Sequence, residues 1–234
     1  KLHQIIIQTM KASVTILKFI SQQMIEYTNS NFTDDFDVIY VNDKFYLEEV
    51  ENATFSEYKL PRQNDYLFVI EGDFNFINDN FICSNIKAGA IESKVETHVL
   101  IDICNFVSCT VKSEYENGGE INFINCGMKC VRSDFIDCTS TTDGKGGRIY
   151  IQINTSIHED SLIEDCTFTG CYAIYGCGAY IYSYVKTKLI SFKKCTFTKN
   201  SVIESKENEE ESSGSALYLI TAKSIVIRCK FVNN

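Results

Sequence analysis

The chain has 234 residues, a formal net charge of −9 and 44% hydrophobic residues, which is enough apolar material for a core. Such a length fits one large domain or two small ones. The acidic balance, with a pI near 4.9 and no cluster of Lys and Arg, argues against a nucleic-acid partner, because phosphate backbones are held by grouped basic side chains. The 13 Tyr and 16 Phe residues favour strands over helices.

The N-terminal segment, residues 1–20, is expected to form a cap or a first strand. Its apolar runs would cover the first edge of a sheet, which would otherwise template aggregation. The segment 13–25 is interrupted by Lys18, Gln22 and Gln23, so it does not predict a membrane span. The chain begins with Lys1 and shows no obvious signal peptide, which we interpret as a processed product or a fragment.

Two short motifs then alternate along the chain. In the first, a Phe has Cys or Ser two residues before it and Cys or Asn three residues after it; its clear copies centre on Phe106, Phe135, Phe168, Phe197 and Phe231. In the second, a pair of Gly or other small residues precedes an apolar strand; its copies lie at 88–91, 118–121, 146–149, 177–182 and 214–217. The same register extends back, with less support, to Phe32, Phe55 and Phe81. An internal repeat of this kind is typical of a solenoid.

The repeat predicts an all-β fold, a single right-handed parallel β-helix of about six to eight coils with three short strands per coil. Residues that share a face of a strand are two apart in the sequence. The apolar residues seven and five positions before each Phe are an odd number of positions away from the Cys two before it, so in one straight strand they would face the opposite side. We therefore expect a bend between them, so that both pairs point inward. Degenerate coils are expected over 21–73 and regular coils over 74–234, stacked about 4.8 Å apart.

Stacked coils place equivalent residues in columns. The Phe residues form one column, the residues two before them a second, and the residues three after them a third, at a turn. Asn suits the third column because its amide can bond the turn backbone of neighbouring coils. The third column contains Cys109, Cys138, Cys171, Asn200 and Asn234.

The 11 cysteines follow this repeat rather than the spacing of a zinc site, since Cys126 and Cys130 have no second close pair of ligands. A column spacing of about 4.8 Å falls within the Cα range of a disulfide, but parallel side chains can lack the required dihedral angle. Buried free thiols are favoured in the second column, and at least one bridge is expected at the turn if the protein is secreted. The disulfide candidates are Cys104, Cys109, Cys138, Cys166 and Cys171.

In these motifs the chain resembles the repeats of bacterial polymorphic outer membrane proteins, and similar repeats in surface proteins of some protists. The resemblance rests on Phe-x-x-Asn at 197–200 and 231–234, in alternation with Gly-Gly-x-Ile, and it covers residues 74–234. It implies a surface-displayed, structural or adhesive β-helix. This chain differs from the family pattern by having Cys in place of Asn at Cys109, Cys138 and Cys171.

Some β-helices are polysaccharide lyases or hydrolases, so outward charged columns are candidate catalytic sites. The column three before each Phe contains Arg132, Asp165, Lys194 and Arg228. A lyase with a calcium site needs several acids, and this column has one, so a surface ion-pair ladder is the favoured interpretation. Asp134 and Asp137 lack matching carboxylates in the next coil, which a hydrolase pair requires, and His98 and His158 are isolated. No catalytic, cofactor-binding or metal-binding residue is predicted.

Three other outward features have functional interpretations. The first is a small array of threonines, like that of ice-binding β-helices, formed by Thr167, Thr169, Thr196 and Thr198. Two rungs are too few for such a surface, so ordinary strand threonines are favoured. The second is a group of aromatic residues, suited to glycan stacking or simply to strands, formed by Tyr172, Tyr175, Tyr180, Tyr182 and Tyr184. The third is a set of glycosylation candidates, relevant only in a secretory pathway, at Asn31, Asn52 and Asn154.

Together these features predict a non-enzymatic protein of the extracellular space or cell surface, with a structural or adhesive role and no cofactor. The last repeat unit ends at 231–234 with an open coil, which predicts end-to-end self-association into filaments, with further chain or another partner as alternatives. Host or cell-surface glycans and proteins are the other expected partners; nucleic acid and membrane insertion are not expected. The alternative function is a carbohydrate-active enzyme, a lyase or hydrolase, or a glycan-binding module.

Overall fold

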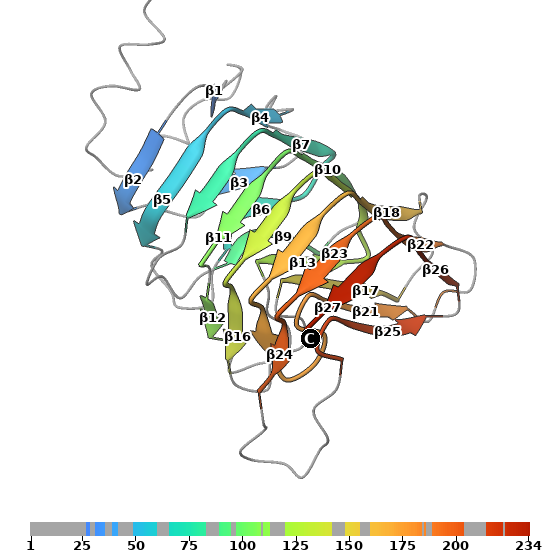
Figure 1. The fold of residues 1–234 in the computed structure, drawn as a ribbon. Coiled ribbons are helices and arrows are strands. Elements are labelled where there is room, and N and C mark those ends of the chain that lie inside the picture. Colours follow the sequence, from blue (N-terminus) through green and yellow to red (C-terminus); the bar gives the residue numbers. More distant parts are fainter. Residues whose placement is uncertain are drawn as a thin grey trace, which may run out of the picture.

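The computed structural model describes residues 27–28, 31–35, 39–41, 49–59, 66–82, 89–94, 97–108, 110–112, 120–141, 148–154, 160–183, 185, 189–203, 214–221 and 223–234. Within these ranges the regular elements are strands, and they pair in parallel to form a β-helix (Figure 1). The predicted all-β class and β-helix architecture are therefore confirmed. The predicted cap over 1–20 lies outside the described residues.

Four sheets form the walls of the β-helix. Sheet A contains β1 (Tyr27–Thr28), β4 (Glu49–Glu51), β7 (Phe74–Ile77), β10 (His98–Asp102), β14 (Gly127–Val131), β18 (Ser161–Glu164), β22 (Ile190–Lys193) and β26 (Ser224–Ile227). Sheet B contains β2 (Asn31–Asp35), β5 (Thr54–Lys59), β8 (Asn80–Ile82), β11 (Asn105–Val107), β15 (Asp134–Ile136), β19 (Thr167–Thr169), β23 (Thr196–Thr198) and β27 (Lys230–Val232). Sheet C contains β3 (Ile39–Val41), β6 (Tyr66–Ile70), β9 (Gly89–Ser93), β13 (Ile121–Ile124), β17 (Ile149–Ile153), β21 (Ala179–Ser183) and β25 (Leu217–Thr221). Sheet D contains β12 (Thr110–Lys112), β16 (Thr139–Thr141), β20 (Tyr172–Ala173) and β24 (Ser201–Val202).

Each coil up to the one that starts at β22 runs from sheet A to sheet B and on to sheet C, and the last described coil consists of β26 and β27. Four consecutive coils, which start at β10, β14, β18 and β22, add a strand of sheet D between sheets B and C. The prediction of three short strands per coil is wrong for these four coils. Sheets A and B contain eight strands each, whereas four coils have a strand in every sheet, against the about six to eight coils predicted. The extra strands arise because β-favouring residues follow the turn after each Phe and pair with their equivalents in the next coil.

The Phe column runs along sheet B. Backbone register pairs Phe32 with Phe55 and Phe55 with Phe81, so the extension of the repeat to these three positions is confirmed. From Phe55 onward the rings stack, with centroids between 4.7 Å for the pair Phe168–Phe197 and 5.3 Å for the pair Phe55–Phe81. This spacing matches the separation of paired strands, so the rings stack as a direct consequence of the coil repeat.

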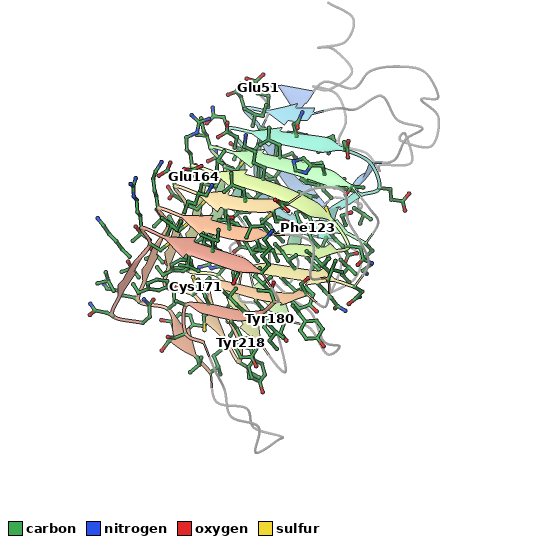
Figure 2. All side chains as sticks on the ribbon, turned by 90° about the vertical axis from the view of Figure 1, so that its right-hand side faces the viewer. Glu51, Phe123, Glu164, Cys171, Tyr180 and Tyr218 are labelled. Atoms are coloured by element: carbon green, nitrogen blue, oxygen red, sulfur yellow. The ribbon has the colours of Figure 1, made fainter. Side chains whose placement is uncertain are left out.

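Inward-facing residues of the three larger sheets fill the interior of the β-helix (Figure 2). Along β17 the burial is nearly continuous, and its inward residues Ile149, Ile151 and Ile153 are fully buried. In β18 and β19 buried and partly exposed residues alternate, as expected for strands with one face in the core. The interior is therefore packed with side chains, and candidate sites must lie at its corners or on its outer faces.

Candidate functional site

The corner between sheets A and B is formed by a residue with a left-handed backbone. These residues lie three before each Phe of the column, with φ between 49° and 56°, and they are Asn52, Asn78, Ile103, Arg132, Asp165, Lys194 and Arg228. A single left-handed residue turns the chain sharply, so that residues an odd number of positions apart on its two sides can both point inward. The predicted bend is therefore present, and it has the same geometry in every described coil from Asn52 onward.

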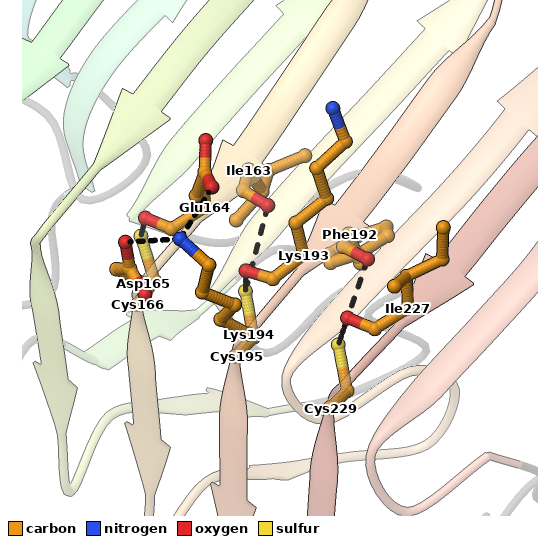
Figure 3. A network of polar contacts seen from close by, with 10 residues as sticks. All are labelled: Ile163, Glu164, Asp165, Cys166, Phe192, Lys193, Lys194, Cys195, Ile227 and Cys229. Atoms are coloured by element: carbon orange, nitrogen blue, oxygen red, sulfur yellow. Dashed lines mark hydrogen bonds and ion pairs between the residues drawn. The ribbon is translucent and has the colours of Figure 1, made fainter.

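The residue after this corner, in the second column, links consecutive coils by hydrogen bonds. The Cys195 thiol lies 3.4 Å from the carbonyl oxygen of Lys193 and 3.5 Å from that of Ile163 in the preceding coil (Figure 3). Equivalent contacts, in the same column, are made by Cys104, Cys166 and Cys229. Ser133 fills the same position and donates to the carbonyl of Val131 at 2.9 Å. The column therefore uses short S–H and O–H donors to satisfy corner carbonyls.

Oxygen atoms in this column also accept a backbone N–H from the coil before. The Cys104 N–H donates to Ser133 Oγ at 3.0 Å. Asp79 does the same with a carboxylate: its Oδ1 accepts the Ala53 N–H at 2.8 Å, and its Oδ2 accepts the Ile77 N–H at 3.1 Å. Burial raises the pKa of Asp79 to about 7, although the two backbone donors oppose this effect. Asp79 is thus a buried acid that titrates near neutrality.

At the corner after each Phe, residues of the third column make hydrogen bonds of the same kind to the backbone of the neighbouring coil. Asn200 donates through Nδ2 to the carbonyl of Phe168 at 3.2 Å, and its Oδ1 accepts the Cys171 N–H at 3.0 Å. Asn234 makes the equivalent bonds to Phe197 and Asn200 one coil later. Asn amides in the third column therefore bond the turn backbone of neighbouring coils, as predicted.

The described disulfide candidates are buried free thiols. Cys138 donates to the carbonyl of Ile136 at 3.2 Å, and Cys104 lies in the second column described above. Burial raises the pKa of the Cys171 thiol to about 11, so its thiolate is scarce at neutral pH. Cys109, which would complete the predicted turn column, lies outside the described residues. In the described part of the chain these thiols are placed as structural donors, not as exposed nucleophiles.

The charged column at the first corner forms ion pairs between coils. Lys194 Nζ lies 3.0 Å from Glu164 and 3.4 Å from Asp165 in the preceding coil. Arg132 pairs with Asp102, which belongs to the adjacent column and not to the one predicted. The basic side chains of these pairs are about half exposed to solvent, so each pair adds little stability. The column therefore has the features of the predicted surface ion-pair ladder.

Asp134 and Asp137 are not directed at a common point. Asp134 is a partly exposed residue of β15, whereas Asp137 is a left-handed turn residue with φ of 52°. His98 begins β10, where its backbone N–H donates to Asp73 at 2.7 Å. His158 lies outside the described residues. Nothing in this placement assembles the two carboxylates that a glycosidase would need.

The threonine array has the predicted register but remains small. Thr167 pairs with Thr196 and Thr169 pairs with Thr198 on sheet B. The neighbouring strands place Asp134 on one side and Lys230 on the other. The threonines therefore form two rungs between charged residues, which is an ordinary strand surface.

Tyrosines on sheet C stack on one another. The Tyr180 ring lies 5.4 Å from Tyr150 and 5.0 Å from Tyr218, with nearly parallel planes, and Tyr175 meets Tyr218 edge-on. Tyr150 was not part of the predicted group. Because neighbouring rings cover each other's faces, the inner rings of this stack do not offer a flat face to a sugar. In the predicted group Tyr172 is exposed, whereas Tyr184 lies outside the described residues.

Two of the glycosylation candidates are on the described surface. Asn154 is exposed after β17, and Asn52 is a left-handed corner residue whose Oδ1 accepts a bond from Asn78. The backbone of Asn31 begins β2, and its side chain lies outside the described part. The Asn52 and Asn154 side chains both lie at ends of strands, where modification would not interrupt a sheet.

A fully buried ion pair was missed by the sequence analysis. Arg148 Nη1 donates to Glu120 Oε1 at 2.7 Å, and Arg148 Nη2 donates to the carbonyl of Thr169 at 3.2 Å. Burial raises the pKa of Glu120, and the Arg148 guanidinium opposes this shift. Glu120 and Arg148 each follow a Gly pair, at the same repeat position in consecutive coils. Opposite charges at a position that is otherwise small or apolar were therefore the sequence signal that could have predicted this ion pair.

No group of three or more His, Cys, Asp or Glu side chains in the described part could hold a metal ion. The same part contains no helix with the length and apolar character of a membrane span. The corner columns, the ion pairs and the ring stacks all join one coil to the next. A scan against protein-family models, a search of curated proteins and a search of solved structures found no match to this chain.

Proposed function

We propose that the protein is a non-enzymatic structural or adhesive protein of the extracellular space or cell surface, whose β-helix extends by head-to-tail stacking of copies. The resemblance of its repeat to those of surface proteins supports the location and the role. The observation that carries the stacking is the state of the last described coil, formed by β26 and β27.

Inward-facing residues of that coil are exposed because nothing in the described chain covers them. Phe231 stacks on Phe197 at 5.0 Å with one face and is 50% exposed through the other. Val226, whose strand partner Phe192 is fully buried, is 43% exposed. Another coil stacked here would bury both side chains and pair the open strand edges.

Charge favours a second copy as the source of that coil. The last two coils carry exposed Lys199, Arg228 and Lys230. Near the opposite end of the described stack, Glu51 in β4 is a partly exposed acid. Basic residues at one end and this acid near the other favour a heterologous contact, which does not close and therefore builds a filament.

The test is sedimentation velocity of the whole chain over a concentration series, with two variants. Val226→Lys places a charge on the inward side of the open coil and is expected to abolish association. Ile225→Lys changes the adjacent residue of the same strand, whose side chain faces outward, and should leave association intact. A wild-type protein that stays monomeric, or equal behaviour of both variants, would contradict the proposal.

A second arm tests the absence of enzymatic activity. The protein is incubated with acidic polysaccharides and calcium, and products are followed as unsaturated ends or reducing ends. The proposal predicts no turnover. Turnover would replace the structural function by a carbohydrate-active one, because a lyase or hydrolase produces such ends catalytically.

A further inference from the structure

Two cysteines from consecutive coils meet inside the β-helix. The sulfur atoms of Cys130 and Cys166 lie 3.7 Å apart, and both residues are buried. Cys166 Sγ also lies 3.6 Å from the carbonyl oxygen of Cys130. The two side chains are therefore in van der Waals contact, next to the corner between sheets A and B.

This pair differs from the stacked thiols of the second column. Cys166 and Cys195 occupy equivalent positions in register, so their side chains run parallel. Cys130 lies in β14 opposite Ile163, at a different position in the coil, and approaches Cys166 from the other side of the corner. A disulfide needs converging Cβ–S bonds and a dihedral angle near 90°, which a converging pair can reach by rotation of the side chains.

We propose that Cys130 and Cys166 form a disulfide that joins consecutive coils when the protein folds in the presence of a disulfide oxidant such as oxidised glutathione. One thiol loses its proton, and the thiolate attacks oxidised glutathione to give a mixed disulfide and one glutathione thiolate. The second protein thiolate then attacks the mixed disulfide and releases the other glutathione. The two protein sulfurs lose two protons and two electrons, and one oxidised glutathione becomes two reduced molecules.

The bond forms before the coils are fully stacked. In the folded protein the contact with the Cys130 thiol, together with burial, raises the pKa of Cys166 far above its ordinary value. The attacking thiolate is therefore scarce once the core has closed, and the oxidant has no access to it. During folding both thiols are exposed, and the approach of the two coils brings them together.

The bond would link two consecutive coils in the middle of the stack. The two cysteines are 36 residues apart in the sequence, so the bond closes a loop that spans one coil. Closing this loop restricts the unfolded chain, and the oxidised protein should need more urea to unfold than the reduced one.

The test begins with the wild-type chain, refolded with and without a glutathione redox buffer. Remaining thiols are alkylated under denaturing conditions, and the digest is mapped by mass spectrometry without reduction. We expect a linked peptide that contains Cys130 and Cys166 in the oxidised sample, and 11 alkylated cysteines in the sample refolded without oxidant. The proposal is wrong if Cys130 and Cys166 are both alkylated after oxidative refolding.

Two variants distinguish the effect of the proposed disulfide from general effects of losing a cysteine. Cys130→Ser should remove the difference in urea midpoint between oxidised and reduced protein. Cys195→Ser alters a buried thiol of the same column and should keep both the linked peptide and the difference in midpoint. Loss of the linked peptide in Cys195→Ser, or a midpoint difference that persists in Cys130→Ser, would overturn the assignment. If Cys130→Ser does not fold, the wild-type map alone decides.

Discussion

The guanidinium of Arg148 donates to the carboxylate of Glu120 across two coils, and neither side chain is exposed to solvent. At the same repeat position the neighbouring coils have Ala90 on one side and Gly178 on the other. A slip of one coil would therefore bury a charge against a small apolar residue. A buried pair of this kind costs desolvation energy, and its best-attested use is to fix register, which we expect here.

Removing one partner should be far more harmful than removing both. Arg148→Met leaves Glu120 buried without a counter-charge, and we expect a loss of about 3–5 kcal/mol in the free energy of unfolding. The double variant Glu120→Met with Arg148→Met should recover most of that loss. Urea unfolding at pH 8 measures both. Equal losses in the single and double variants would show that the charge pairing contributes nothing beyond packing.

Asp79 should make the protein less stable as the pH rises from about 4 to about 7. Its folded-state pKa of about 7 lies above the ordinary value, so in this window the folded state binds more protons than the unfolded one. The free energy of unfolding therefore falls with rising pH, by at most about 4 kcal/mol from this group, and levels off above its folded pKa. Asp79→Asn cannot ionise and keeps an acceptor for the Ala53 N–H, so it should remove this part of the slope.

The comparison is urea unfolding of wild type and Asp79→Asn at pH 5 and pH 8. The variant should gain stability relative to wild type at the higher pH. Asp134→Asn, a substitution of a partly exposed carboxylate on sheet B, is the control and should shift little between the two pH values. A difference between wild type and Asp79→Asn that is the same at both pH values would refute the titration.

Replacing Ile103 by a residue that tolerates a positive φ should stabilise the protein. Ile103 is a β-branched residue with φ of 56°, and its side chain is 41% exposed, so little burial is lost on substitution. Asn occupies the same corner at Asn52 and Asn78, and Ile103→Asn should stabilise the protein by about 1 kcal/mol. Ile136→Asn, in an extended strand, should not stabilise it. A shift of the urea midpoint downward in Ile103→Asn would contradict the strain argument.

The Phe column should contribute most where it is covered on both sides. Phe135 stacks at 4.8 Å on both Phe106 and Phe168 and is fully buried, so Phe135→Ala should cost about 3–5 kcal/mol. Phe231→Ala, at the half-exposed end of the same column, should cost clearly less in the monomer. Thermal and urea unfolding at low protein concentration measure the two losses. Equal losses of unfolding free energy in Phe135→Ala and Phe231→Ala would mean that stacking on both faces of a ring adds no stability.

The β-helix could be predicted because its repeat is carried by large residues with a fixed position in each coil. Phe32, Phe55 and Phe81 were placed correctly even without cysteines at the repeat positions, since one aromatic per coil at an inward position is enough to define the register. The bend before each Phe followed from the change of parity. In both cases a local pattern determined a local geometry.

Contacts between unlike positions of neighbouring coils were not predicted. Cys130 and Cys166 belong to different columns, and only the path of the chain around the corner shows that their sulfurs converge. The pairing of Arg132 with Asp102 depends in the same way on side-chain direction and not on column membership. The strands of sheet D were missed because two or three residues carry too short a pattern to separate a strand from a turn.

Head-to-tail stacking of copies through the coil of β26 and β27 can be seen directly by electron microscopy of the whole protein at high concentration. We expect unbranched filaments that grow with concentration, disappear in Val226→Lys and persist in Ile225→Lys. Single, uniform particles of monomer size at the highest concentration reached, for wild type as for Val226→Lys, would contradict head-to-tail stacking.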